Sequence, residues 1–150
     1  MEQFSIKGHN GHFELKFVQV FGFPEQTSPW GGYDVKGEFK IRVGEYSAEG
    51  ELWFSTGEIY QLYEDLKAVN EVLNGTIYFN THENNLEFKL VFDNKGHIVI
   101  KGKYIAAYSR KNELSFEIES DQSFMTSSLS ELQRIVQKYG TKEGLKQASE

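Results

Sequence analysis

Two alternating runs on either side of a Gly-Glu pair constrain the fold of this chain more than any other segment. From residue 35 to 43, apolar side chains or glycine alternate with charged side chains, and the period of two returns from residue 46 to 54. This period is typical of a strand with one buried and one exposed face. Gly44-Glu45 fits a two-residue turn of type II′. The segment therefore predicts an antiparallel hairpin.

The register of this hairpin follows if Val43 pairs with Tyr46. Large side chains then oppose small ones on the buried face, which supports the register. These buried pairs are Ile41 with Ala48, Phe39 with Gly50, and Gly37 with Leu52. The outer face carries Lys40 opposite Glu49, Glu38 opposite Glu51, and Lys36 opposite Trp53. One outer pair thus has like charges, and another places a large aromatic ring among charged side chains.

Two Ser-x-x-Glu motifs predict helix starts, because Ser at the N-cap and Glu three residues later form a capping box. The motifs are Ser55–Glu58 and Ser128–Glu131, and each precedes an apolar helical face. The first face consists of Ile59, Leu62, Tyr63, Leu66, Val69 and Leu73, and the second of Leu132, Ile135, Val136 and Tyr139. Gly75 and Gly140 stand where C-terminal caps are expected.

Further alternating runs predict the remaining strands: residues 4–7, 13–20, 76–80, 86–92, 97–104 and 114–118. The break in alternation at Phe17-Val18 indicates a bulge or a twist. Asn94-Lys95-Gly96 reads as a hairpin loop that pairs Asp93 with His97. That register sets Leu90 against Ile100, Phe88 against Gly102, Leu86 against Tyr104, and Glu87 against Lys103. Another turn is expected at Ser109–Asn112.

The element order, ββ-ββ-α-ββββ-α, predicts an α+β fold. We expect a strongly twisted antiparallel β-sheet or half-open barrel of about eight strands with two amphipathic helices. A chain of 150 residues is most simply one domain, here residues 1–140, followed by a polar C-terminal tail, residues 141–150, that frays.

The segment from Phe21 to Tyr33 contains both prolines of the chain and four aromatic side chains, and it predicts a loop. Its aromatic rings either fold into the open end of the sheet or form a contact surface. For Phe21 and Phe23 the structural role is favoured. For Trp30 the two interpretations stay open, and Gly31-Gly32 indicates close backbone packing beside it.

Composition excludes several classes of function. The net charge is −6 and the lysines are interleaved with acids, so no nucleic-acid partner is expected. No apolar run approaches the ~18 residues of a membrane span, so no membrane partner is expected either. The absence of cysteine and of a signal-peptide pattern favours a cytoplasmic protein. An acidic balance is compatible with a basic protein partner, or with solubility alone.

No catalytic motif, metal site or cofactor is predicted. His9 and His12 lie close together, but metal ligation needs at least three converging ligands and no third is evident. His82 and His97 are isolated turn residues. No histidine has a nucleophile or a paired carboxylate at a catalytic spacing. The sequence therefore favours a binding protein over an enzyme.

The outer face of the first hairpin is the candidate partner-binding surface. A Trp beside acidic side chains on an open sheet face suits an interface anchor, and the competing interpretation is that the C-terminal helix or tail covers it. The candidate residues are Lys36, Glu38, Glu49, Glu51 and Trp53 on this face, with Trp30 in the loop.

Three segments resemble the WapI-type immunity proteins: Phe23-Pro24, Trp30–Asp34, and the block from Gly50 through Leu66. The similarity runs from about residue 4 to residue 140. The resemblance implies a non-enzymatic cytoplasmic antidote that binds and neutralises the C-terminal toxin domain, often a nuclease, of a secreted bacterial toxin. It supplies no contact residues, so those above come from surface character. Toxic nucleases tend to be basic, and an acidic antidote gains association rate from charge complementarity.

An alternative function is a small-ligand carrier that uses the concave sheet face, with the loop of residues 21–33 as its lid. Inward glycines at Gly37, Gly50 and Gly102 either leave room for a ligand or accommodate facing side chains. A cavity of ~300 Å³ or more would favour the carrier, and a filled interior would count against it.

Overall fold

Eight strands and two helices make up the part of the chain that the computed structural model describes, residues 2–106 and 112–145. The first half contains β1 (Gln3–Lys7), β2 (Gly11–Val20), β3 (Asp34–Val43), β4 (Tyr46–Ser55) and α1 (Thr56–Val72). The second half contains β5 (Gly75–Asn80), β6 (Leu86–Phe92), β7 (His97–Ile105), β8 (Glu113–Asp121) and α2 (Gln122–Tyr139). The predicted α+β class and element order are confirmed. The turn expected at Ser109–Asn112 falls mostly outside the described residues.

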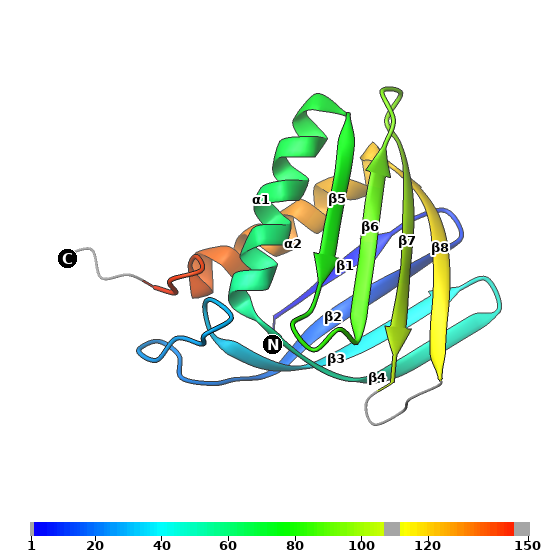
Figure 1. The fold of residues 1–150 in the computed structure, drawn as a ribbon. Helices are drawn as coiled ribbons and strands as arrows, with labels where there is room; N and C mark the ends of the chain where they lie inside the picture. The colour runs from blue at the N-terminus through cyan, green and yellow to red at the C-terminus, as the bar shows by residue number, and fades with distance from the viewer. Residues whose placement is uncertain (1, 107–111, 146–150) are drawn as a thin grey trace.

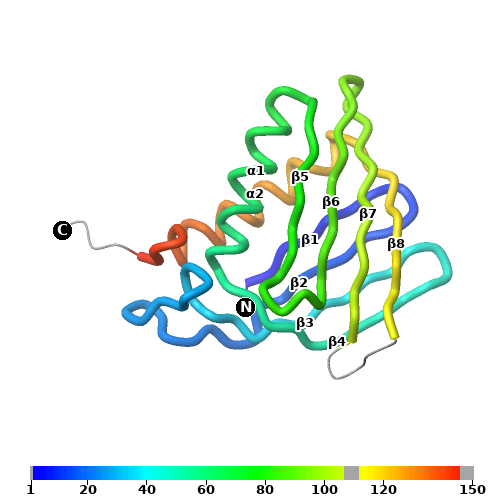
Figure 2. The backbone as a smooth tube through the Cα atoms, viewed as in Figure 1, coloured from blue at the N-terminus to red at the C-terminus, as the bar shows by residue number. Residues whose placement is uncertain are grey.

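The strands divide into two four-stranded antiparallel sheets, β1-β2-β3-β4 and β5-β6-β7-β8, and each sheet is followed by a helix. The sheets lie face to face with their strands crossing, and both helices lie along one side (Figures 1 and 2). Aromatic rings fill the space between them. The Phe13 ring contacts Phe39, Phe88 and Phe116 at centroid distances of 5.6, 5.0 and 5.7 Å, so one core joins the two sheets.

Both predicted hairpin registers are confirmed residue by residue, as is the bulge between Phe17 and Gln19. Aromatic side chains occupy the space next to the inner-face glycines. A Cβ on Gly37 would lie 2.4 Å from the Phe54 ring, and one on Gly50 would lie 2.1 Å from the Tyr104 hydroxyl. A Cβ on Gly102 would meet the Phe116 ring at 2.7 Å. These glycines therefore make room for aromatic packing rather than for a ligand.

The capping box of α1 is present as predicted, but the helix ends differently. The Ser55 hydroxyl accepts from the Glu58 amide at 3.2 Å, and Glu58 Oε1 accepts from the Ser55 amide at 2.7 Å. Leu73, in the left-handed conformation at φ 54°, is the C-cap. Gly75 instead begins β5, so its prediction as the cap is wrong.

The second Ser-x-x-Glu motif does not start a helix. Because Asp121 is the N-cap, α2 begins at Gln122, and Ser128 and Glu131 lie inside the helix. The Ser5 amide of β1 donates to Glu131 Oε1 at 2.9 Å, and the Ser128 hydroxyl donates to the Ser5 carbonyl at 2.5 Å. Residues three apart share one helix face, so the motif here clasps an edge strand.

The segment after α2 packs against the loop of residues 21–33. Gly140 ends the helix as predicted. The Gly32 amide donates to the Lys142 carbonyl at 2.6 Å, and the Leu145 amide donates to the Tyr33 hydroxyl at 3.0 Å. Residues 141–145 therefore have fixed contacts with the body of the fold, and residues 146–150 lie outside the described part. No helix in the described ranges is long and apolar enough to cross a membrane.

Candidate functional site

The loop of residues 21–33 is fastened to the N-terminus of α1. The Ser55 hydroxyl donates to the Trp30 carbonyl at 3.3 Å, and the Gly57 amide donates to the Gly31 carbonyl at 3.1 Å. Gly31 and Gly32 have φ angles of 93° and 65°, and a Cβ on Gly32 would lie 2.1 Å from Thr56 Oγ1. The double glycine thus permits a close approach that a side chain would prevent.

Trp30 combines exposure with a fixed orientation. Its side chain is 58% exposed, yet its ring stacks on the His82 imidazole at a centroid distance of 4.8 Å and an interplanar angle of 6°. His82 Nδ1 lies 3.1 Å from Glu58 Oε1, the atom that also accepts from the Ser55 amide. The capping box of α1 therefore orients the imidazole that supports the tryptophan.

Glu58 is a partly buried carboxylate at the base of this arrangement. Burial raises the pKa of its carboxyl group, and hydrogen bonds from His82 and the Ser55 amide partly oppose that rise. A carboxylate in such surroundings gains more from an added positive charge than a fully solvated one does.

A hollow of about 240 Å³ opens beside Trp30. Its lining comes from the loop, the first turns of α1, strand β5 and the segment after α2: Trp30, Gly57, Glu58, Gln61, Leu62, Tyr78, Phe79, Asn80 and Lys142. Tyr78 is 72% exposed, so the hollow has two exposed aromatic side chains and one carboxylate. The hollow is large enough to hold a single side chain of a partner protein.

The outer face of β3 and β4 carries the other predicted partner-binding residues. The register places Lys36, Glu38, Glu49, Glu51 and Trp53 there, as expected. The like-charge pair Glu38 and Glu51 is relieved, because Lys40 Nζ lies 3.4 Å from Glu38 and Lys36 Nζ lies 3.5 Å from Glu51. The neighbouring lysines thus offset the repulsion between Glu38 and Glu51 that the sequence indicated.

Among the described residues, the Phe21 ring of the loop covers Trp53. The Phe21 ring stacks on it at 5.5 Å with an interplanar angle of 27°, which leaves Trp53 half-buried and Phe21 37% exposed. Phe23 packs edge-on against Tyr33 and Tyr139 at 5.1 and 5.0 Å. Phe23 thus packs against buried rings, whereas Phe21 lies over Trp53 on the outer face rather than in the open end of the sheet.

The predicted residues lie on two surfaces. Five belong to the outer face of β3 and β4, whereas Trp30 lies in the loop beside β5 and α1. Ser55 follows Trp53 by two positions and binds the Trp30 carbonyl, so the two tryptophans flank the same strand end. No sequence pattern pointed to His82, because it meets Trp30 and Glu58 only in the folded chain.

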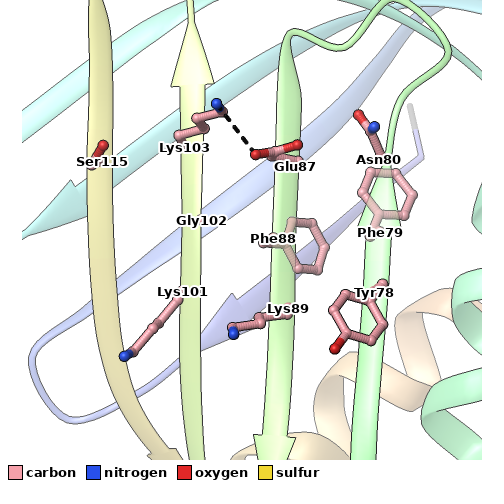
Figure 3. Close-up of a pocket in the computed structure, with 10 residues that line it drawn as sticks. All are labelled: Tyr78, Phe79, Asn80, Glu87, Phe88, Lys89, Lys101, Gly102, Lys103 and Ser115. Carbon is pink, nitrogen blue, oxygen red and sulfur yellow. Dashed lines mark ion pairs between the residues drawn. The ribbon is translucent and has the colours of Figure 1, made fainter.

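A second, larger hollow of about 510 Å³ lies on the outer face of β5–β8 and was not predicted (Figure 3). Lys89 lies opposite Lys101 in the register, and Lys101 Nζ pairs with Glu117 at 3.5 Å. Lys103 Nζ pairs with Glu87 at the same distance. All lining residues belong to β5–β8, so the loop of residues 21–33 does not cover this hollow and the carrier hypothesis gains no lid.

His9 and His97 each lie beside a surface carboxylate. His9 Nε2 lies 2.8 Å from Asp121 Oδ2, and Asp121 is the N-cap of α2. His97 Nδ1 lies 3.3 Å from Asp93 Oδ2 across the β6–β7 turn. Among the described residues, no group of three His, Cys, Asp or Glu side chains is arranged to hold a metal ion.

Comparison with known families decides what kind of protein this is. Residues 4–140 match the model of the Immunity protein WapI-like family. The chain belongs to this family. The match covers both sheets and both helices, so the family assignment applies to the whole described fold. Comparisons with curated proteins and with solved structures find no match.

Proposed function

We propose that the chain is a non-enzymatic immunity protein that binds and neutralises the C-terminal toxin domain of a secreted bacterial toxin. The observation that carries this proposal is the match to the WapI-like immunity family across residues 4–140. The net charge of −6 supports a basic partner such as a nuclease, because opposite charges speed association. A cytoplasmic location belongs to the same proposal, since an antidote must meet its toxin inside the producing or recipient cell.

The corner around the loop of residues 21–33 is the proposed docking surface. Trp30 supplies an exposed aromatic anchor, and Trp53 with its Phe21 cover supplies a second contact on the other side of the strand end. The charged residues of the β3–β4 face would form a polar rim around Trp53. These residues are Lys36, Glu38, Glu49 and Glu51. Each is expected to contribute little to binding alone, because surface charges, paired or not, are well solvated before a partner arrives.

Co-expression with the toxin domain encoded beside this protein tests the proposal. Cells that make both proteins should survive, and the two proteins should purify as a complex. A catalytically inactive toxin domain provides the control for binding without toxicity. Cell death together with the absence of a complex between the purified proteins would show that the proposed function is wrong.

A further inference from the structure

The hollow beside Trp30 has aromatic walls and an acidic base. Trp30 and Tyr78 are 58% and 72% exposed, and one face of the Trp30 indole is occupied by His82. The Glu58 side chain, 16% exposed, lines the same hollow. Aromatic faces attract cations, and a carboxylate within reach of the same group adds a charge-assisted hydrogen bond. The two kinds of group together fit a cationic side chain.

The Glu58 carboxylate is the charge that favours a cation, and it is the one acidic side chain among the described residues that line the hollow. Two features oppose a cation: the side chain of Lys142 lines the hollow, and the N-terminus of α1 carries positive partial charge. Lys142 is exposed and its amine can turn into solvent, whereas the Glu58 carboxylate is held in place by its hydrogen bonds to the Ser55 amide and His82.

The anchor is held before any partner arrives. The Trp30 carbonyl is bound by the Ser55 hydroxyl, its amide donates to Ser28 Oγ at 3.1 Å, and its ring rests on His82. Binding therefore does not have to fix this side chain, which removes part of the entropy lost on association. Exposed aromatic side chains with a fixed orientation are typical binding hot spots.

We propose that this hollow receives an arginine side chain of the toxin domain, with its guanidinium stacked on Trp30 and hydrogen-bonded to Glu58. Arginine fits better than lysine because its planar group can stack on an aromatic face and present two donors to one carboxylate. The proposal rests on the proposed function, since it names the group that the partner contributes to the Trp30 side of the docking surface.

Glu58→Gln tests the charge without removing the contacts that shape the site. Glutamine keeps an Oε1 that can accept from the Ser55 amide and from His82, so α1 and the imidazole stay in place. We expect the affinity for the purified toxin domain, measured by calorimetry, to fall about tenfold or more. The matched control Glu117→Gln, an exposed carboxylate of β8 that pairs with Lys101, should change it by less than about threefold.

A variant that should raise rather than lower the affinity separates the proposed contact from an effect of misfolding. Lys142→Glu removes the competing cation, and the affinity should rise by about threefold or more at low salt and by less at high salt. A gain in affinity cannot arise from a damaged fold. A loss of affinity in Lys142→Glu would overturn the proposed arginine contact.

A double-mutant cycle identifies the partner group. Each surface arginine of the toxin domain is changed to glutamine and, separately, to lysine, and each change is combined with Glu58→Gln. One arginine should couple to Glu58, and its lysine variant should recover only part of the affinity. If the toxin domain binds and is neutralised but no arginine couples to Glu58, the inference is wrong and the proposed function stands. If the wild-type protein does not bind the toxin domain, both are wrong.

Discussion

The two tryptophans of this chain are each stacked on another ring at the same strand end, and they differ in which ring faces water. Trp30 lies outside His82 and is 58% exposed, whereas Trp53 lies beneath Phe21 and is half-buried. The strand pattern had marked Trp53 as the exposed aromatic of the outer face. The difference shows that a loop, rather than the strand alternation, decides which tryptophan a partner can reach.

The charged neighbours of the two rings differ as well: those beside Trp53 are neutralised within the chain, and those beside Trp30 line an open hollow. Beside Trp53, Glu51 pairs with Lys36 and Glu38 pairs with Lys40, so the face neutralises itself. Beside Trp30, Glu58 contacts His82 and lines an open hollow. The self-neutralised face suits the rim of an interface, and the open hollow suits its centre.

The largest expected effect is on binding by Trp30→Ala. Removing an exposed hot-spot ring should weaken toxin-domain binding by about 2 kcal/mol, or 30-fold, while the free energy of unfolding changes by less than about 1 kcal/mol. Trp53→Ala should weaken binding much less, because Phe21 already covers that ring. Calorimetry and urea denaturation measure the two quantities. Equal losses of affinity in both variants would remove the distinction between the tryptophans.

Gly57→Ala tests whether the position of Trp30 depends on the close contact between the loop and α1. Alanine raises helix propensity by about 1 kcal/mol, but its Cβ would lie 2.6 Å from the Gly31 carbonyl group. The Gly31 carbonyl is part of the loop backbone and is hydrogen-bonded to the Gly57 amide, so it cannot move away easily. We therefore expect a net destabilisation of about 1–2 kcal/mol and weaker toxin binding. A more stable Gly57→Ala protein in urea denaturation would show that the loop can move away at little cost.

Phe21→Ala should expose the Trp53 ring to solvent, as the Trp30 ring is exposed now. Loss of the stacked ring exposes the indole, and we expect stability to fall by about 0.5–1.5 kcal/mol. In a Trp30→Phe background, Trp53 is the sole tryptophan and its fluorescence maximum should move to longer wavelength. An unchanged emission spectrum would mean that another group covers Trp53.

The smallest expected effect is on the pH dependence of stability near Glu58. The pKa of this carboxyl group is raised by folding, so the native state binds more protons than the unfolded state above the ordinary pKa of 4.5. Glu58 therefore contributes stability that is lost as the pH rises from about 4.5 through the raised pKa. Glu58→Gln removes this contribution, so its stability relative to wild type should improve between pH 4 and pH 7. Urea denaturation across that range measures it, and a fall in relative stability would contradict the assignment.

Local patterns predicted the sheets because each hairpin carries its own register information. The turn at Gly44-Glu45 and the glycines opposite Phe39 and Leu52 fix the first pairing without reference to the rest of the chain. The capping box of α1 was equally local, since Ser55 and Glu58 satisfy each other. These elements follow from physics that acts within a few residues or across one turn.

Features that depend on distant segments were mispredicted or missed. Ser128 and Glu131 carry the same motif as the α1 cap, yet they bind Ser5 of β1. The stack of His82 on Trp30 joins two loops from different sheets. Nothing in the periodicity indicated that the eight strands would divide into two facing sheets. Only the tertiary packing of the whole chain decides these contacts.

The clasp between Ser5 and α2 has a consequence for synthesis on the ribosome. Strand β1 is made first among the elements and α2 last, so the edge of β1 stays without its partner until α2 has emerged. An uncovered strand edge is a template for pairing with other chains. We therefore expect nascent chains that stall before α2 to be more prone to aggregate than the complete chain.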